Sequence, residues 1–225
     1  MKYKALLFDF YGTIVEEADD YVTEICKEIS HDLKYQVFPH EIAKQWFKIV
    51  PRMCFNAFGP NFRLQKDIAV ESLQEVLHNL QCDLNSYELM QIIRDYWIAP
   101  KIFHESKSVL ERCDLPMCIV TNADNEFIYM ALKKHNLTFS HVITSETCKS
   151  YKPRADIYLK ALSVLGLSNE EVLLIGDSYS NDVVGGKSAK IPVLWINRKN
   201  KNLSKTDVQP DYISHDLHGV LKYVK

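Results

Sequence analysis

Residues 4–13 read Lys4-Ala5-Leu6-Leu7-Phe8-Asp9-Phe10-Tyr11-Gly12-Thr13. Positions 5–8 are apolar without alternation, which predicts a strand buried on both faces of a parallel sheet. Asp9 stands where this strand ends, and open α/β sheets bind ligands at that end of their strands. A carboxylate held ionised by cations can act there as a nucleophile, and Gly12 lets the backbone turn close to a ligand. The same residues also suit an ordinary turn in which Asp9 accepts backbone hydrogen bonds, so the rest of the chain must decide.

The composition is that of a folded soluble protein, with 225 residues, 47% hydrophobic and 25% charged. The net charge of -2 gives no electrostatic reason to expect nucleic acid or an anionic membrane as a partner. No apolar run approaches the about 18 residues that span a bilayer, and the first residues read as a strand rather than a signal peptide. Six cysteines without a Cys-x-x-Cys pair predict free, mostly buried thiols and a cytoplasmic location. Nothing in the sequence indicates an oligomeric state.

Residues 16–96 lack any strand-like run and predict four amphipathic helices, which form a small bundle. Turn signals at 38–39 and 58–61 separate these helices. We therefore expect an α/β core of residues 1–15 and 97–225, interrupted by a helical insert of residues 16–96. The apolar positions at helical spacing are Tyr21, Ile25, Ile29 and Leu33; Ile42, Trp46 and Ile49; Ile68, Leu73, Val76, Leu77 and Leu80; and Leu89, Ile92, Ile93 and Tyr96.

Strands and helices alternate from residue 100 onward, which predicts parallel strands joined by right-handed crossovers. The predicted strands are 116–120, 141–144, 172–175, 193–196 and an edge strand at 211–214, followed by a closing helix at 217–224. Polar residues follow two of these strands: Thr121 with Asn122, and Asp177 with Asp182. Lys152 lies in a loop of the same half. Parallel strands end at one edge of a sheet, so these groups can meet Asp9 there.

Each polar group taken singly has an ordinary explanation. Lys152 suits a solvated loop, and Thr121 with Asn122 suits a strand-end turn. Asp177 and Asp182 could cap the short helix that follows them. All of these explanations must hold together if no site is present.

Together these residues resemble the haloacid dehalogenase superfamily of hydrolases. Each motif is weak alone, but all four occur in order, at fitting spacings, over essentially the whole chain. The helical insert takes the place of the family's helical cap, so the resemblance implies a Rossmann-like parallel sheet with an inserted four-helix cap. The motifs are Asp9-Phe10-Tyr11-Gly12-Thr13, Thr121-Asn122, Lys152-Pro153, and Gly176-Asp177 through Asn181-Asp182.

The resemblance implies a covalent aspartyl intermediate at Asp9 and a Mg²⁺ ion held by Asp9, the backbone carbonyl of Tyr11, and Asp177. Lys152 would pair with Asp9 and with phosphoryl oxygens, because an anion that attacks an anion needs cations nearby. Asp182 would ligate through water or orient the lysine.

The remaining implied roles concern the substrate, which would be a small anionic molecule. Thr121 would act in catalysis by holding phosphoryl oxygens, and Thr13 would brace the turn. The residues expected to contact the phosphate are Tyr11, Gly12, Thr13 and Asn122. Substrate choice would depend on the insert and its loops, with Glu16, Glu17, Arg52, Arg63 and several aromatic residues as candidates.

Tyr11 departs from the phosphatase pattern. Phosphatases of the family usually carry an aspartate at this position, two residues after the nucleophile, and it protonates the leaving oxygen. A phenol with a pKa of about 10 is a poor acid at pH 7. The leaving group would then depart unassisted unless the cap supplies a proton donor.

Tyr11 and Tyr158 instead resemble the 2-haloacid dehalogenase branch, in which a halide leaves without a proton. That branch uses no metal and has serine where this chain has Asp177. It also binds halide through an early cap arginine, whose place falls on Phe47 here, although Arg52 or Arg63 could substitute.

Three functions stay open. The first is a Mg²⁺-dependent phosphohydrolase of a small phosphorylated metabolite, which we favour because Asp177 and Asp182 repel each other unless a cation binds. The second is a metal-independent 2-haloacid dehalogenase. The third is a binding or regulatory protein that keeps the fold with weak or no catalysis.

Overall fold

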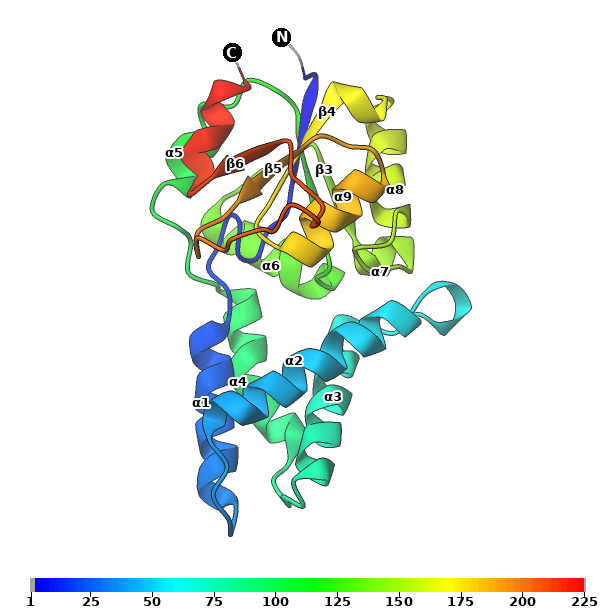
Figure 1. Ribbon diagram of the computed structural model, residues 1–225. Helices are drawn as coiled ribbons and strands as arrows, with labels where there is room; N and C mark the ends of the chain where they lie inside the picture. Colours follow the sequence, from blue (N-terminus) through cyan, green and yellow to red (C-terminus); the bar gives the residue numbers. More distant parts are fainter. Residues whose placement is uncertain (1–2, 225) are drawn as a thin grey trace.

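A six-stranded parallel sheet forms the centre of the computed structural model, which describes residues 3–224. The strand order is β3-β2-β1-β4-β5-β6, so β1 lies between β2 and β4 (Figure 1). The predicted α/β fold class is confirmed, and the opening apolar run is a central strand. The strands are β1 Ala5–Phe8, β2 Met117–Thr121, β3 His141–Thr144, β4 Val172–Gly176, β5 Val193–Ile196 and β6 Tyr212–Ser214.

Helices cover both faces of the sheet, and this explains why β1 is apolar at every position. Ala5 and Leu7 pack in one hydrophobic cluster with residues of α8, whereas Leu6 and Phe8 pack in a second cluster with residues of α5 and α6. The predicted closing helix is present, as a 3₁₀-helix at Leu217–Lys222, a form common in short terminal pieces. The core helices are α5 Ser106–Leu110, α6 Asn125–His135, α7 Ser145–Cys148, α8 Asp156–Leu165 and α9 Gly185–Ser188.

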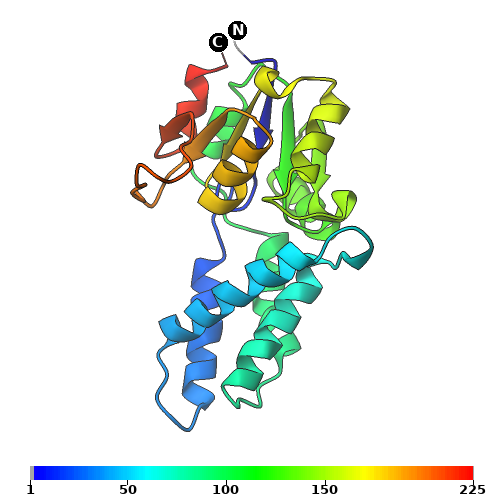
Figure 2. The same cartoon turned by 45° about the vertical axis from the view of Figure 1, so that its right-hand side comes forward.

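Four helices lie beyond the carboxyl edge of the sheet and make up the helical insert (Figures 1 and 2). α1 and α3 each pack against both α2 and α4. Trp46 of α2 lies in their shared core and donates a hydrogen bond from Nε1 to Ser72 Oγ at 2.8 Å. α2 extends beyond the predicted apolar set and runs through Pro51 to Asn56. The insert helices are α1 Asp19–Asp32, α2 Pro39–Asn56, α3 Gln65–Asn79 and α4 Ser86–Ile98.

Two paired chain segments connect the insert to the core. Val15 forms an antiparallel bridge with Ile102, and the Glu16 N–H donates to the Lys101 carbonyl at 2.7 Å. Tyr96 of α4 donates from its hydroxyl to the Glu16 carbonyl at 2.7 Å. The entry to α1 is therefore held in a fixed place beside the end of β1.

The insert also contacts the core on its other side. The carboxylate of Asp124, at the start of α6, accepts the backbone N–H groups of Gln65 at 2.8 Å and Lys66 at 2.9 Å. These donors belong to the first turn of α3, where backbone N–H groups lack partners within the helix. Tyr151 adds a hydrogen bond from its hydroxyl to the Arg63 carbonyl at 2.8 Å.

Two expectations about the chain's surroundings can be compared with the structure. All six cysteines are free, but only Cys26 and Cys118 are buried and the other four are half-buried. No helix in the described part of the chain combines the length and the apolar character needed to cross a bilayer.

Candidate active site

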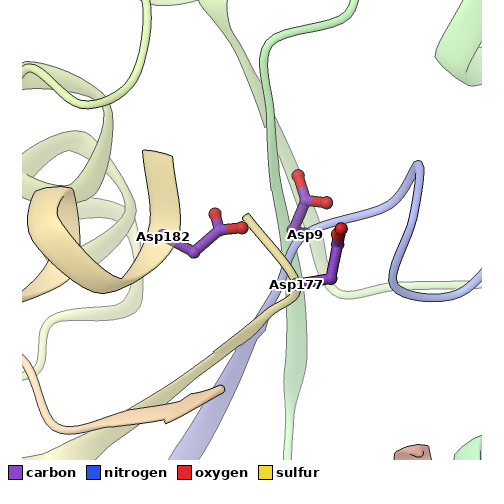
Figure 3. A group of neighbouring side chains, drawn as sticks. All are labelled: Asp9, Asp177 and Asp182. Atoms are coloured by element: carbon purple, nitrogen blue, oxygen red, sulfur yellow. The ribbon is translucent and has the colours of Figure 1, made fainter. Parts of the chain in front are cut away.

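Three carboxylates meet at the carboxyl edge of the sheet (Figure 3). Asp9 follows β1, Asp177 follows β4, and Asp182 projects from the helical turn Tyr179–Val184. One oxygen from each lies within 4.8 Å of the others. The sequence predicted this meeting from the parallel order of the strands.

Lys152 joins two of these acids. Its Nζ lies 2.7 Å from Asp9 Oδ1 and 2.7 Å from Asp182 Oδ1, and its side chain is 1% exposed. Burial by itself lowers the pKa of Lys152, but the carboxylates of Asp182 and Asp9 outweigh it and raise that pKa above the ordinary value. Lys152 is therefore a buried ammonium group that holds the candidate nucleophile in place.

The residues after β2 position Lys152. Asn122 Oδ1 accepts the Lys152 backbone N–H at 2.8 Å, and Asn122 Nδ2 donates to the Lys152 carbonyl at 3.4 Å. Both polar atoms of the Asn122 side chain are thus hydrogen-bonded to the backbone of Lys152. The predicted contact of Asn122 with phosphate stays a prediction. Thr121 is buried at the cavity wall, where its Oγ1 accepts the Ala123 N–H at 3.3 Å and keeps its own hydrogen to donate.

Asp177 has no cation within ion-pair distance among residues 3–224. Thr13 Oγ1 lies 3.0 Å from Asp177 Oδ1 and 3.3 Å from Asp9 Oδ2, so this hydroxyl connects the turn after β1 to both acids. Burial, followed by the charges of Asp9, Glu17 and Asp182, raises the pKa of Asp177 well above its usual range.

The charge balance of the cluster fits a divalent cation. Burial is also the main cause that raises the pKa of Asp182, to about 6, despite the nearby ammonium of Lys152. Three carboxylates and one ammonium leave a large negative excess, and all free donor atoms are oxygens. Mg²⁺ prefers such oxygens, and its positive charge would stabilise the ionised forms of Asp177 and Asp182.

Two glycines allow the acids to approach the backbone. Gly12 has φ +87°, and a β-carbon there would lie 2.5 Å from Asp177 Oδ1. A β-carbon at Gly176 would lie 2.3 Å from Cγ of Asp182. The turn at Gly12 brings the backbone close to Asp177, and its predicted approach to a ligand stays a prediction. The need for a glycine at position 176 was not predicted.

A cavity of about 460 Å³ opens beside Asp9, between the sheet edge and the helical insert. Asp9, Thr121 and Lys152 line it from the core, and Pro51 and Phe55 of α2 line it from the insert. Further lining residues include Tyr11, Glu17, Val50, Trp97 and Arg154. The space suits a small molecule.

Tyr11 is not placed to supply a proton. Its hydroxyl donates to the Trp97 carbonyl at 2.6 Å, and burial is the main cause that raises the pKa of Tyr11 far above that of a free phenol. Tyr158, the other tyrosine of the dehalogenase pattern, donates to the Asn181 carbonyl and does not line the cavity.

Neither arginine considered for halide binding reaches the cavity. Arg52 pairs with Glu75 at 2.6 Å, and Arg63 pairs with Glu71. Phe47 is exposed and also lies outside the cavity lining.

The arginine that does line the cavity, Arg154, was missed by the sequence analysis. Its guanidinium lies 3.8 Å from the ring centroid of Phe58. Its position next to Lys152-Pro153 was the only available signal. The contact partner comes from the distant helical insert, and no local pattern indicates that pairing.

The chain is similar to known proteins along its length. A family model described as "Haloacid dehalogenase-like hydrolase" matches residues 6–196. The pyrophosphatase PpaX of Bacillus cereus is 25% identical over 98% of this chain and 96% of that protein. A solved L-2-haloacid dehalogenase superposes with a TM-score of 0.83 at 20% identity, covering 100% of this chain and 99% of the other. A magnesium-bound structure of YfnB from Bacillus subtilis gives a TM-score of 0.74 at 19% identity, covering 100% of both chains.

Proposed function

Because this chain belongs to the haloacid dehalogenase-like hydrolases, we propose that it is a Mg²⁺-dependent phosphohydrolase that acts through a covalent intermediate at Asp9. The observation that carries this proposal is Asp177, a half-buried carboxylate beside Asp9 without a cation partner among residues 3–224. A carboxylate without a cation partner, placed beside a second carboxylate, is costly unless an ion binds between them. The similarity to the pyrophosphatase PpaX supports a phosphohydrolase rather than a dehalogenase.

Asp9 attacks phosphorus with one carboxylate oxygen while Lys152 holds the other at 2.7 Å. Asp182 orients the ammonium of Lys152, whose remaining N–H points to a phosphoryl oxygen, and Thr121 donates its hydroxyl hydrogen to another. Asp9, the backbone carbonyl of Tyr11, and Asp177 would hold Mg²⁺. When bound, the ion offsets the repulsion between the attacking carboxylate and the phosphoryl group.

We further propose that residues 16–96 act as a cap over a core of residues 1–15 and 97–225. The cavity between them excludes bulk water once a small phosphorylated metabolite is bound. The six free thiols suit the reducing conditions of the cytoplasm.

A metal-independent 2-haloacid dehalogenase is the second candidate, and one observation favours it. Tyr11 stands where a phosphatase needs an acid, and a halide leaves without a proton. Two observations oppose it: Asp177 replaces the uncharged residue that a metal-free site needs, and Arg52 and Arg63 are engaged outside the cavity. A binding protein with weak catalysis is the third reading and also rests on Tyr11.

Parallel assays separate these functions. The purified protein is incubated with p-nitrophenyl phosphate and with 2-chloropropionate, each in Mg²⁺ and in EDTA. We expect nitrophenol release in Mg²⁺, its loss in EDTA, and no chloride release in either buffer. Chloride release that persists in EDTA would establish the dehalogenase. Absence of turnover with every substrate and divalent metal would leave only the binding role.

A further inference from the structure

One carboxyl group in the cavity has no role so far. Glu17 lines the cavity beside Asp9 but makes no hydrogen bond or ion pair with any of residues 3–224. The other two carboxylates that line this cavity, Asp9 and Asp182, are both bound to Lys152. Glu17 is therefore the one carboxyl group in the described cavity wall that is free to exchange a proton with a ligand.

The chain path fixes Glu17 next to the nucleophile. The preceding residue, Glu16, is bonded to the Lys101 backbone and to the Tyr96 hydroxyl, and α1 begins two residues after Glu17. Glu17 also lines a second cavity that contains Gly12 and Asp177. It thus stands on the wall that borders both the nucleophile and the unpaired acid.

The groups that face Glu17 favour its protonated form. Partial desolvation comes first, followed by the negative charges of Asp9 and Asp19, and together they raise the pKa of Glu17 above that of an ordinary glutamate. Asp182 and Asp177 add to this repulsion, whereas Lys199 opposes it. Lys199 is itself paired with Asp19 at 2.7 Å. Glu17 also keeps exposed surface, so a ligand and water can reach its carboxyl group.

We propose that Glu17 is the general acid of this hydrolase and takes the place that Tyr11 leaves empty. This inference rests on the proposed phosphohydrolase function. As Asp9 oxygen bonds to phosphorus, the bond from phosphorus to the leaving oxygen breaks, and that oxygen takes the proton of the Glu17 carboxyl group to leave as an alcohol. Water then attacks phosphorus and breaks its bond to Asp9, and the phosphate formed gives up a proton that returns to the Glu17 carboxylate. Phosphate is released, and Asp9 and protonated Glu17 are regenerated.

The dependence on the leaving group tests this role. Wild type, Glu17→Gln and Glu17→Asp are each assayed with p-nitrophenyl phosphate, whose leaving group needs no acid, and with ethyl phosphate, whose leaving group does. We expect Glu17→Gln to reduce kcat with ethyl phosphate by about 10²- to 10⁴-fold and to leave kcat with p-nitrophenyl phosphate close to wild type. Glu17→Asp should recover part of the ethyl phosphate activity.

The matched control is Asp20→Asn, which removes an exposed carboxylate from the first turn of α1 outside the cavity beside Asp9. It should leave both activities unchanged. An equal effect of Glu17→Gln on the two substrates, or no effect on either, would overturn the role of Glu17. So would a wild-type enzyme that hydrolyses p-nitrophenyl phosphate but not ethyl phosphate. Failure of wild type with both substrates would instead reject the phosphohydrolase function itself.

Discussion

The carboxylate of Asp177 occupies the space where a β-carbon of Gly12 would otherwise lie. A β-carbon there would come within 2.5 Å of Asp177 Oδ1 and 2.6 Å of Oδ2. The turn that ends the first motif and the acid that ends the last motif are thus in direct contact. Only glycine at position 12 allows both the left-handed turn and this contact.

Gly12→Ala tests this contact. We expect a loss of about 1–3 kcal/mol in the free energy of unfolding from the left-handed backbone, plus displacement of Asp177 and loss of Mg²⁺-dependent activity. Gly59→Ala is the matched control, because Gly59 has φ +55° but no atom within 4 Å of its β-carbon position. Chemical denaturation and activity assays compare the two variants. Equal activity in both would show that the approach of Asp177 to the turn is not needed.

Lys152→Met tests the buried ion pairs. The substitution leaves Asp9 and Asp182 buried without their cation, so we expect a loss of about 3–5 kcal/mol in the free energy of unfolding at pH 7.5. Adding Asp182→Asn should recover part of that stability without restoring activity. Urea titrations of both variants supply the measurement. If Lys152→Met alone were as stable as wild type, Lys152 would not be offsetting the charges of Asp9 and Asp182.

Asp124→Ala tests the attachment of the helical insert. It removes the acceptor of the Gln65 and Lys66 N–H groups, which costs about 1–3 kcal/mol and should speed hydrogen exchange at these two amides. Glu126→Ala is the control, since it removes only the partly exposed ion pair with Lys66 across the same boundary and should cost less than about 1 kcal/mol. Unchanged exchange at both amides in Asp124→Ala would contradict this attachment.

The stability gained from Mg²⁺ should depend on pH. The pKa of Asp182 rises from 3.8 to about 6 on folding without metal, and that of Asp177 also rises. A raised folded pKa means that protonation favours the fold, so this stability is present below pH 3.8 and is lost as pH rises through about 6.

Thermal unfolding in EDTA and in Mg²⁺ measures this effect. We expect Mg²⁺ to raise Tm more at pH 7.5 than at pH 5, and Asp177→Asn to reduce the gain at pH 7.5. The same Mg²⁺ shift at both pH values, or in both proteins, would be inconsistent with an ion at these acids.

The core of the site could be predicted because its placement follows from a general rule of topology. Asp9 and Asp177 follow apolar strands, and parallel strands place such residues at one edge of the sheet. The high pKa of a phenol was also enough to predict that Tyr11 does not protonate the leaving group. The role of Lys152 could be predicted only from the resemblance to the family, since a lysine in a loop does not by itself indicate a site.

Features that depend on how the insert docks could not be predicted. The contact of Asp124 with α3 joins residues that are 59 positions apart, and neither segment has a pattern that points to the other. The lining of the cavity by Arg154 depends on the same docking, whereas Glu17 was among the residues expected to face the substrate. Helix α2 continues through Pro51 because packing against α1 and α3 outweighs the local preference to end there.

A crystal structure with Mg²⁺ and trifluoroberyllate, a mimic of the phosphoryl group, tests the central claim most directly. We predict one metal ion in contact with oxygens of Asp9 and Asp177, and a beryllium atom bonded to Asp9 within reach of Lys152 Nζ. An empty position between Asp9 and Asp177 in crystals soaked at high Mg²⁺, or trifluoroberyllate bound away from Asp9, would contradict the account.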